Sequence, residues 1–181
     1  MTDSLPHGNC YRVAPQFIAG EYPGAPSRGD AQARIARHLA AGITCFLDLT
    51  EAGELDPYTE VLVHAAAVRR HAAIHHRMPI RDVSIPTAPA LMVAILDTLD
   101  AAIADGHTVY VHCWGGIGRT GTVVGCWLVR HGMQGEEALA TIARHWLGVE
   151  KHARKPRSPE TDEQCAYVRG WREPSRETGS R

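Results

Sequence analysis

The sequence lacks an excess of charge of either sign. Its 181 residues include 19 lysines and arginines against 20 aspartates and glutamates, which leaves a formal net charge of −1. This balance argues against a nucleic-acid binder and against a polybasic membrane binder, so we expect neither kind of partner. Lysine is scarce beside arginine, and we interpret this as genome composition.

Long apolar runs and a cysteine framework are missing as well. Every apolar stretch is interrupted by Asp or Arg before it reaches the roughly 20 residues of a membrane span. The first residues contain no apolar core of a secretory signal. The cysteines are odd in number, and their spacing matches neither a disulfide framework nor a zinc knuckle. We therefore expect a cytoplasmic protein with reduced thiols.

Ordinary globular composition is what remains. Hydrophobic residues make up 44% of the chain and charged residues 22%, as in soluble folded proteins. The length suits one compact domain. We predict one domain over residues 1–172, followed by a polar, disordered tail over residues 173–181.

Strand and helix patterns alternate along the chain. This alternation predicts an α/β fold in a single domain, with a central, mostly parallel sheet of about four to five strands and helices on both faces. In the last helix we expect Ser158 as the N-cap and Pro159 at the first position. The basic segment 151–157 is predicted to be a solvated loop. Strands are expected over residues 16–20, 43–49, 74–78 and 108–112, and helices over residues 27–41, 58–70, 90–104, 120–131, 136–146 and 158–171.

One segment carries chemistry. Residues 112–121 read HCWGGIGRTG and lie between a predicted strand and a predicted helix. The glycines allow a tight backbone cradle with N–H groups pointing inward, and the helix N-terminus adds partial positive charge. Arg119 offers a planar fork that matches two phosphate oxygens. Cys113 lies at the foot of this positive site, which favours a thiolate aimed at phosphorus.

This segment resembles the signature loop of the cysteine-based protein tyrosine phosphatases, His-Cys-x-x-Gly-x-Gly-Arg-Ser/Thr-Gly, at every fixed position. The resemblance implies a phosphomonoester hydrolase that works through a cysteinyl-phosphate intermediate and needs no metal or other cofactor. Cys113 would be the nucleophile, Thr120 would assist the departure of its sulfur, and His112 would hold the loop. The implied phosphate-binding residues are Trp114, Gly115, Gly116, Ile117, Gly118 and Arg119.

The family takes its general acid from an Asp about 30 residues before the cysteine, and Asp82 lies 31 positions before Cys113. Its proline-bounded loop resembles that of the dual-specificity branch. The plainer alternative is that Asp82 only caps a turn. Asp48, at a strand end, is expected to organise a neighbouring loop. Three further candidates fit less well because they lie in or at the end of a predicted helix: Asp97, Asp100 and Asp105.

Weaker resemblances cover most of residues 9–171. Residues 17–24 and 46–51 resemble small bacterial and phage dual-specificity-like phosphatases. Residues 158–164 resemble the segment that positions the hydrolytic water in the tyrosine-specific branch, although Glu160 stands where that pattern has its first glutamine and Gln164 keeps the second. A helix start explains the same residues without a catalytic role.

Several alternatives stay open. The expected substrate is a phosphorylated protein, with phosphotyrosine first; the alternative is a non-protein phosphomonoester such as a phosphoinositide, nucleotide or sugar phosphate. A phosphate-binding pseudoenzyme and rhodanese-like sulfur transfer are disfavoured by the complete set of Cys113, Arg119 and Asp82. The sequence makes no prediction of oligomeric state.

Other residues have two interpretations each. These are Tyr58 (pocket wall or core aromatic), Cys45 and Cys126 (disulfide partners of an oxidised Cys113 or buried structural cysteines), and His71, His75 and His76 (metal cluster or polar strand edge).

Overall fold

A five-stranded sheet forms the centre of the computed structural model, which describes residues 4–69 and 72–174. In the spatial order β1-β2-β5-β3-β4, only β1 is antiparallel to its neighbour, so the predicted mostly parallel sheet is confirmed. The first strand was not anticipated from the sequence. The strands are β1 (Cys10–Ala14), β2 (Phe17–Gly20), β3 (Cys45–Asp48), β4 (Ile74–Arg77) and β5 (Val109–His112).

Alternation of side chains along the strands builds a core on each face of the sheet. Successive residues of a strand point to opposite faces. The middle residues Ile18, Phe46 and Tyr110 belong to one buried cluster. Their neighbours belong to the other cluster: Phe17, Ala19, Cys45, Leu47, Val109 and Val111. Because both faces are covered, the central strands β2, β3 and β5 read as short apolar runs rather than as alternating ones.

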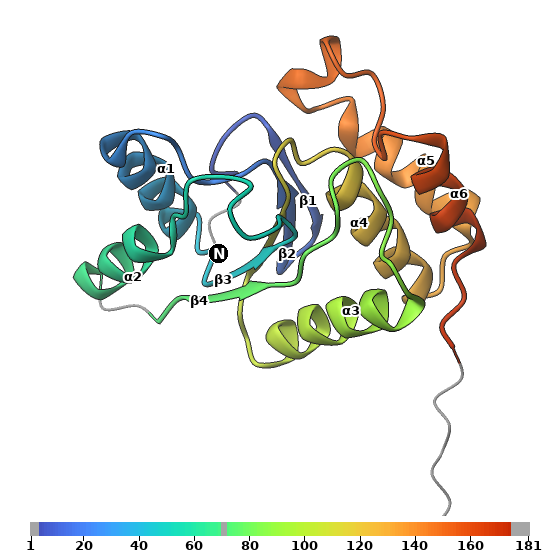
Figure 1. Cartoon of the computed structure of the whole chain (residues 1–181), viewed down its shortest axis with the longest axis horizontal. Coiled ribbons are helices and arrows are strands. Elements are labelled where there is room, and N and C mark those ends of the chain that lie inside the picture. Colours follow the sequence, from blue (N-terminus) through green and yellow to red (C-terminus); the bar gives the residue numbers. More distant parts are fainter. Residues whose placement is uncertain (1–3, 70–71, 175–181) are drawn as a thin grey trace, which may run out of the picture.

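Helices cover the two faces unequally (Figure 1). On one side lie α1 (Arg28–Ala40) and α2 (Thr59–Val68); on the other lie α3 (Pro89–Ala104), α4 (Gly118–Arg130), α5 (Gly135–Trp146) and α6 (Asp162–Gly170). A short 3₁₀ helix, η1 (Glu150–Ala153), follows α5. The helix α4 packs against α3, α5 and α6, and its residues 118–128 are all buried.

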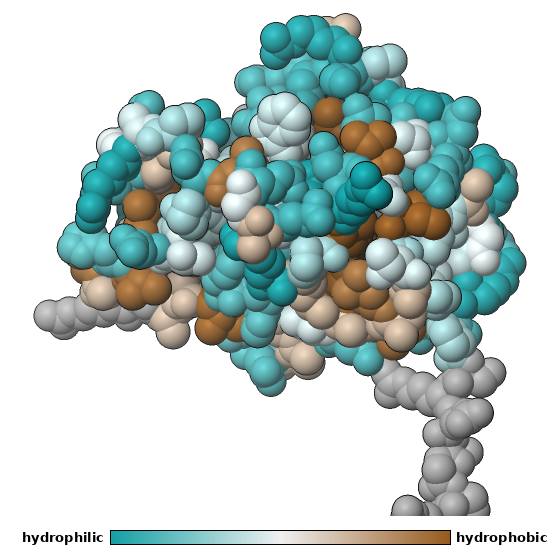
Figure 2. Space-filling model, viewed as in Figure 1, coloured by the Kyte–Doolittle hydropathy of each residue, from teal (hydrophilic) through white to brown (hydrophobic). Residues whose placement is uncertain are grey.

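The outer surface agrees with this layering. The face seen in Figure 2 is mostly hydrophilic, and hydrophobic side chains show mainly between α3 and α4 and at the α2 end. In the part of the chain that the structure describes, no helix combines the length and the apolar character that crossing a bilayer would require. Of the predicted tail 173–181, residues 175–181 lie outside the described residues.

The start of the last helix differs from the prediction, and Ser158 as its N-cap is wrong. The helix begins at Asp162, and Thr161 is the N-cap: its hydroxyl accepts a hydrogen bond from Gln164 N, while the Gln164 side chain accepts from Thr161 N. This reciprocal pair is a capping box. The Ser158 hydroxyl donates instead to the carbonyl of Ile117, 2.8 Å away.

Buried His38 makes the stability of this fold sensitive to acid. Its ring packs 4.6 Å from that of Tyr110, and burial lowers the pKa of His38 to about 3. In the unfolded chain His38 takes up a proton as the pH falls below about 6.5, whereas in the folded chain it stays neutral until about pH 3. The contribution of neutral His38 to stability is therefore fully present above pH 6.5 and is lost as the pH falls from 6.5 towards 3. Burial also lowers the pKa of His112 to about 4, with the same sign.

We expect the free energy of unfolding to decrease between pH 6.5 and pH 4, and His38→Phe to make that decrease shallower by up to about 1.4 kcal/mol per pH unit. Denaturant unfolding at several pH values measures this slope. His64→Phe, on the exposed side of α2, is the matched control and should leave the slope unchanged. An identical slope in the wild type and the His38 variant would contradict the assignment.

Candidate active site

The predicted site residues converge at one edge of the sheet. Strands β2, β3, β4 and β5 run parallel, so their carboxyl ends meet at the same edge, where α/β proteins usually bind ligands. The loop after β5 carries Cys113, the loop after β4 carries Asp82, and the loop after β3 carries Glu54. The loops after β4 and β5 border a cleft of about 500 Å³, with Cys113 and Arg119 in its lining.

The backbone of the signature loop is fixed from outside. Gly116 has φ of +70°, and a Cβ added there would lie 2.4 Å from the carbonyl carbon of Gly20, so only glycine fits. Three loop carbonyls accept hydrogen bonds from groups beyond the loop: Trp114 O from Tyr22 N at 3.0 Å, Gly115 O from Lys151 Nζ at 2.8 Å, and Ile117 O from Ser158 Oγ at 2.8 Å. With its carbonyls engaged outward, the loop can offer its amides to an anion.

At the start of α4, two buried polar atoms lack hydrogen-bond partners. The Thr120 hydroxyl and the Arg119 Nε are buried, and neither makes a hydrogen bond within residues 4–69 and 72–174. Buried donors are normally paired, and a bound ligand or a reacting group is one way to pair these two. Cys113 itself is 3% exposed. The arrangement is suited to an oxyanion held over a thiol.

Arg119 is held by a residue that the sequence analysis did not single out. The two terminal nitrogens of Arg119 donate to the two carboxylate oxygens of Glu54 at 2.7 and 2.6 Å, and Nη1 also donates to Ile80 O at 3.2 Å. Burial alone would raise the pKa of Glu54, but the bonds from Arg119 lower it overall. Bidentate pairing of this kind fixes the plane and direction of a guanidinium. Glu54 is therefore a positioning residue for Arg119.

Glu54→Gln should lower kcat/KM for an aryl phosphate by roughly tenfold or more, because a charge-assisted hydrogen bond contributes about 1.5–3 kcal/mol. Steady-state kinetics measures this change, and we expect both a lower kcat and a higher KM. The matched control is Glu51→Gln in the same loop, whose side chain is exposed. Equal kinetics for the two variants would show that Glu54 does not position Arg119.

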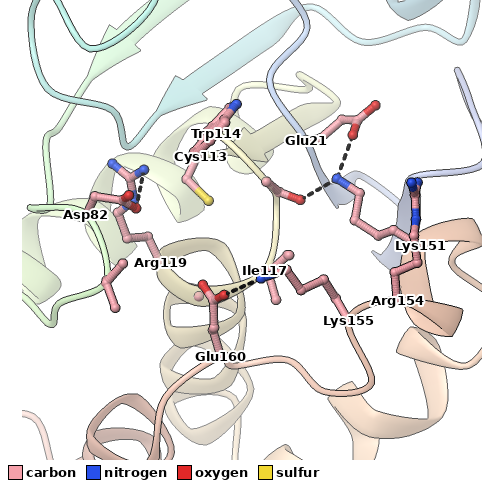
Figure 3. A pocket seen from close by; sticks show the side chains of 13 residues that line it. Glu21, Asp82, Cys113, Trp114, Ile117, Arg119, Lys151, Arg154, Lys155 and Glu160 are labelled. Atoms are coloured by element: carbon pink, nitrogen blue, oxygen red, sulfur yellow. Dashed lines mark hydrogen bonds and ion pairs between the residues drawn. The ribbon is translucent and has the colours of Figure 1, made fainter.

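Asp82, the predicted acid, lies beside Arg119. Its Oδ1 is 2.8 Å from Arg119 Nη2, and the side chain is 48% exposed at the mouth of the cleft (Figure 3). The next residue, Val83, has φ of +56°, which is strained for a β-branched side chain and leaves it exposed in the cleft lining. The structure thus brings Asp82 to Arg119, whereas Asp100 lies elsewhere and accepts from Trp127 and Arg130.

Behind the loop, His112 is fully buried and hydrogen-bonded through Nε2 to the Tyr58 hydroxyl at 2.7 Å. Tyr58 is 1% exposed, so it is a core aromatic and not a wall of the pocket. Asp48 accepts from the backbone and hydroxyl of Thr50 at 2.9 and 2.6 Å and from His75 at 3.3 Å. As expected, Asp48 organises the loop that follows its strand.

The two candidates for positioning water occupy different places. The Glu160 carboxylate lines the cleft and pairs with Lys155 at 3.1 Å. The Gln164 amide is buried: its oxygen accepts from the backbone of Glu160 and Thr161, and its nitrogen donates to Ser84 O at 3.0 Å. Gln164 therefore joins α6 to the loop that carries Asp82.

Other sequence-based alternatives can now be placed. Cys45 and Cys126 are buried and free, like Cys113. His75 and His76 lie on the edge strand β4, and His71 lies outside the described residues. Within the described part of the chain, no three His, Cys, Asp or Glu side chains are grouped to hold a metal ion.

The prediction of a solvated loop over residues 151–157 is wrong for Lys151. Lys151 is not solvated: it lines the cleft and is bonded to Glu21 and to the signature loop. The sequence signal that could have suggested this is the presence of both lysines of the chain in one short segment, 151–155.

Comparison with known proteins agrees with the fold. A curated relative, the uncharacterized protein MJECL20 of Methanocaldococcus jannaschii, is 40% identical over 57 residues, which are 32% of this chain and 38% of that protein. The match thus spans well under half of that relative's length. Among solved structures, P. aeruginosa TpbA in complex with pTyr has 19% identity and a TM-score of 0.65, covering 93% of this chain and 88% of that one. PTPMT1 in complex with PI(5)P has 18% identity and a TM-score of 0.63, covering 89% and 92%.

At these identities the structural neighbours establish the fold alone. The family is established by sequence: the model described as "PTP-SAK: Swiss Army Knife protein, DSP-PTPase phosphatase domain" matches residues 12–181. The resemblance seen in the signature loop is confirmed by this match, which covers nearly the whole chain. The chain belongs to the PTP-SAK family of DSP-PTPase phosphatase domains, within the cysteine-based protein tyrosine phosphatase superfamily.

Proposed function

We propose that the protein hydrolyses phosphomonoesters through a cysteinyl-phosphate intermediate. One observation carries the proposal: Cys113 and Arg119 line one cleft, and the Asp82 carboxylate lies 2.8 Å from the Arg119 guanidinium. This grouping supports Cys113 as the nucleophile, Arg119 as the oxyanion-binding group and Asp82 as the acid of one reaction.

In the first step the Cys113 thiolate attacks phosphorus as the bond to the leaving oxygen breaks. Protonated Asp82 gives its proton to that oxygen, and Arg119 with the loop amides binds the equatorial oxygens. When the substrate binds, its phosphate oxygens accept hydrogen bonds from Arg119 Nε, which has no other partner in the described part of the chain, and from Nη2, which then releases the Asp82 carboxylate. No metal enters these steps.

In the second step a water attacks the phosphocysteine. Asp82, now a carboxylate, accepts a proton from the water, and the S–P bond breaks to return the thiolate. We assign the stabilisation of that thiolate to the Thr120 hydroxyl, which is buried and has no hydrogen-bond partner among the described residues. Glu160, in the cleft lining, orients the water, and Gln164 supports this by holding α6 against the Asp82 loop.

For the substrate, a first candidate is phosphotyrosine in a protein. Trp114, which is 62% exposed, and the apolar side chains of Val83 and Ile117 line the cleft and can flank an aromatic ring. The similar TpbA was crystallised with pTyr. A reducing, cytoplasmic location stays a prediction and would keep Cys113 as the thiol that the reaction needs.

A second candidate is a non-protein phosphomonoester. It is favoured by three basic side chains in the cleft lining, Lys151, Arg154 and Lys155, which phosphotyrosine alone would not use. The similar PTPMT1 was crystallised with PI(5)P.

Turnover of p-nitrophenyl phosphate, followed by release of the phenolate, tests the reaction class. Rapid acid quenching should trap phosphate on Cys113, and mass spectrometry of the peptide around it should locate the added mass. A pseudoenzyme would bind phosphate without turnover, and a sulfur transferase would leave no phosphorylated cysteine. Either result would overturn the proposal.

A further inference from the structure

One wall of the cleft is basic. It is formed by Lys151, Arg154 and Lys155, all from the segment between α5 and α6 (Figure 3). The chain has only two lysines, Lys151 and Lys155, and both lie on this wall; the other strongly basic residues of the chain are arginines. The reaction proposed above uses none of these three side chains.

Lys151 is built into the wall. Its side chain is only 15% exposed, and Nζ donates to Glu21 Oε2 at 2.6 Å and to Gly115 O at 2.8 Å. One of its bonds is thus to the backbone of the loop that holds the phosphate. The other bond neutralises Glu21, so the Glu21 carboxylate repels an anion there less strongly.

Arg154 and Lys155 are the available charges. Both are exposed, and the Arg154 guanidinium has no hydrogen-bond or ion-pair partner within the described ranges. Lys155 pairs with Glu160 at 3.1 Å, but the two side chains are 55% and 35% exposed. Exposed pairs of this kind contribute about 1 kcal/mol or less, so a phosphate carrying two charges can displace Glu160.

We propose that this basic wall is a subsite for a second phosphate group, and that the substrate is a small molecule carrying at least two phosphates. This rests on the proposed function, because the first phosphate must lie over Cys113. A cleft of about 500 Å³ is of the size that encloses a whole small molecule. Arginine binds phosphate with a planar fork and lysine with a point charge.

The uncharged signature loop, taken alone, weighs against a second phosphate group. Its variable positions, Trp114, Gly115 and Ile117, supply no charge for a second phosphate. The charges come instead from residues 151–155, which fold back over the loop through the bond of Lys151 to Gly115.

A binding experiment tests the subsite without turnover. In a Cys113→Ser background, calorimetric titration should show tripolyphosphate binding at least about tenfold more tightly than orthophosphate, since charge-assisted hydrogen bonds of about 1.5–3 kcal/mol correspond to that ratio. Arg154→Gln/Lys155→Gln should remove most of this preference. The matched control, Arg28→Gln/Arg69→Gln, changes two exposed arginines on α1 and at the end of α2 by the same net charge and should keep it.

A kinetic arm identifies the substrate class. For the wild type, kcat/KM should be at least about tenfold higher for an inositol bisphosphate than for an inositol monophosphate, and the double variant should lose this ratio. Preference for a singly phosphorylated tyrosyl peptide over the bisphosphate would overturn the proposal, as would tripolyphosphate binding no tighter than orthophosphate, or an equal loss in the control pair. If p-nitrophenyl phosphate is not hydrolysed at all, the proposed function fails, while the titration still reports on the subsite.

Discussion

Cys113→Ser should lower turnover of an aryl phosphate by roughly 10⁴-fold or more, which is the scale of losses seen when a catalytic nucleophile is removed. A serine hydroxyl does not ionise in the cradle as a thiol does, so no phosphoenzyme forms. Arg119 and the loop amides remain in place, and the affinity for inorganic phosphate should therefore change little. Phosphate-release assays measure the first effect, and calorimetric titration measures the second.

Cys165→Ser is the matched control, since Cys165 is a free, half-buried cysteine on α6, outside the cleft lining. It should retain wild-type turnover. Substantial hydrolysis by the Cys113 variant would mean that another group attacks phosphorus. Loss of phosphate binding together with activity would mean that the substitution distorted the loop.

Asp82→Asn should slow turnover of a phosphate ester with a poor leaving group by about 10²–10⁴-fold, the usual contribution of general acid catalysis. The asparagine keeps the size of the side chain but has no proton to give to the leaving oxygen. The loss should shrink for esters of very acidic phenols, because their leaving groups depart without protonation. A series of aryl phosphates with increasingly acidic leaving groups measures this trend.

Asp105→Asn, at the exposed end of α3, is the control for the removal of one carboxylate. It should leave the turnover rates of all the aryl phosphates in the series unchanged. A near-normal rate for the Asp82 variant would place the acid elsewhere. A uniform loss across the series would assign Asp82 to binding through its ion pair with Arg119, and not to proton transfer.

The sequence predicted those parts of the molecule that depend on local patterns. Short apolar runs marked β2, β3 and β5, because strands buried on both faces have no polar side. The signature loop was recognisable because its glycines, Cys113 and Arg119 must follow one another at fixed spacing to form a cradle. The position of Asp82 close to Arg119 was predictable from its spacing to Cys113, since only α3 and β5 separate the two loops.

Long-range pairings were not predictable in the same way. Nothing near Glu54 in the sequence indicates that its carboxylate meets Arg119, 65 positions away. Lys151 looked solvated because a basic run gives no sign of the loop carbonyl that it meets. Ser158 looked like an N-cap, but its hydroxyl found a partner in the signature loop, and the capping box at Thr161 and Gln164 began the helix instead.

Neither Gly20 nor Gly116 can acquire a side chain alone in the course of evolution. A Cβ at 116 would meet the Gly20 backbone at 2.4 Å, and a Cβ at 20 would meet the Tyr110 hydroxyl at 2.3 Å. That hydroxyl cannot retreat easily, because it donates to Glu21 O at 2.7 Å and is bonded to His7. Gly116 should therefore be kept in every lineage that keeps the cradle, because the atoms that a Cβ would meet are backbone, and Gly20 should be lost only where both Tyr110 and Cys10 have changed.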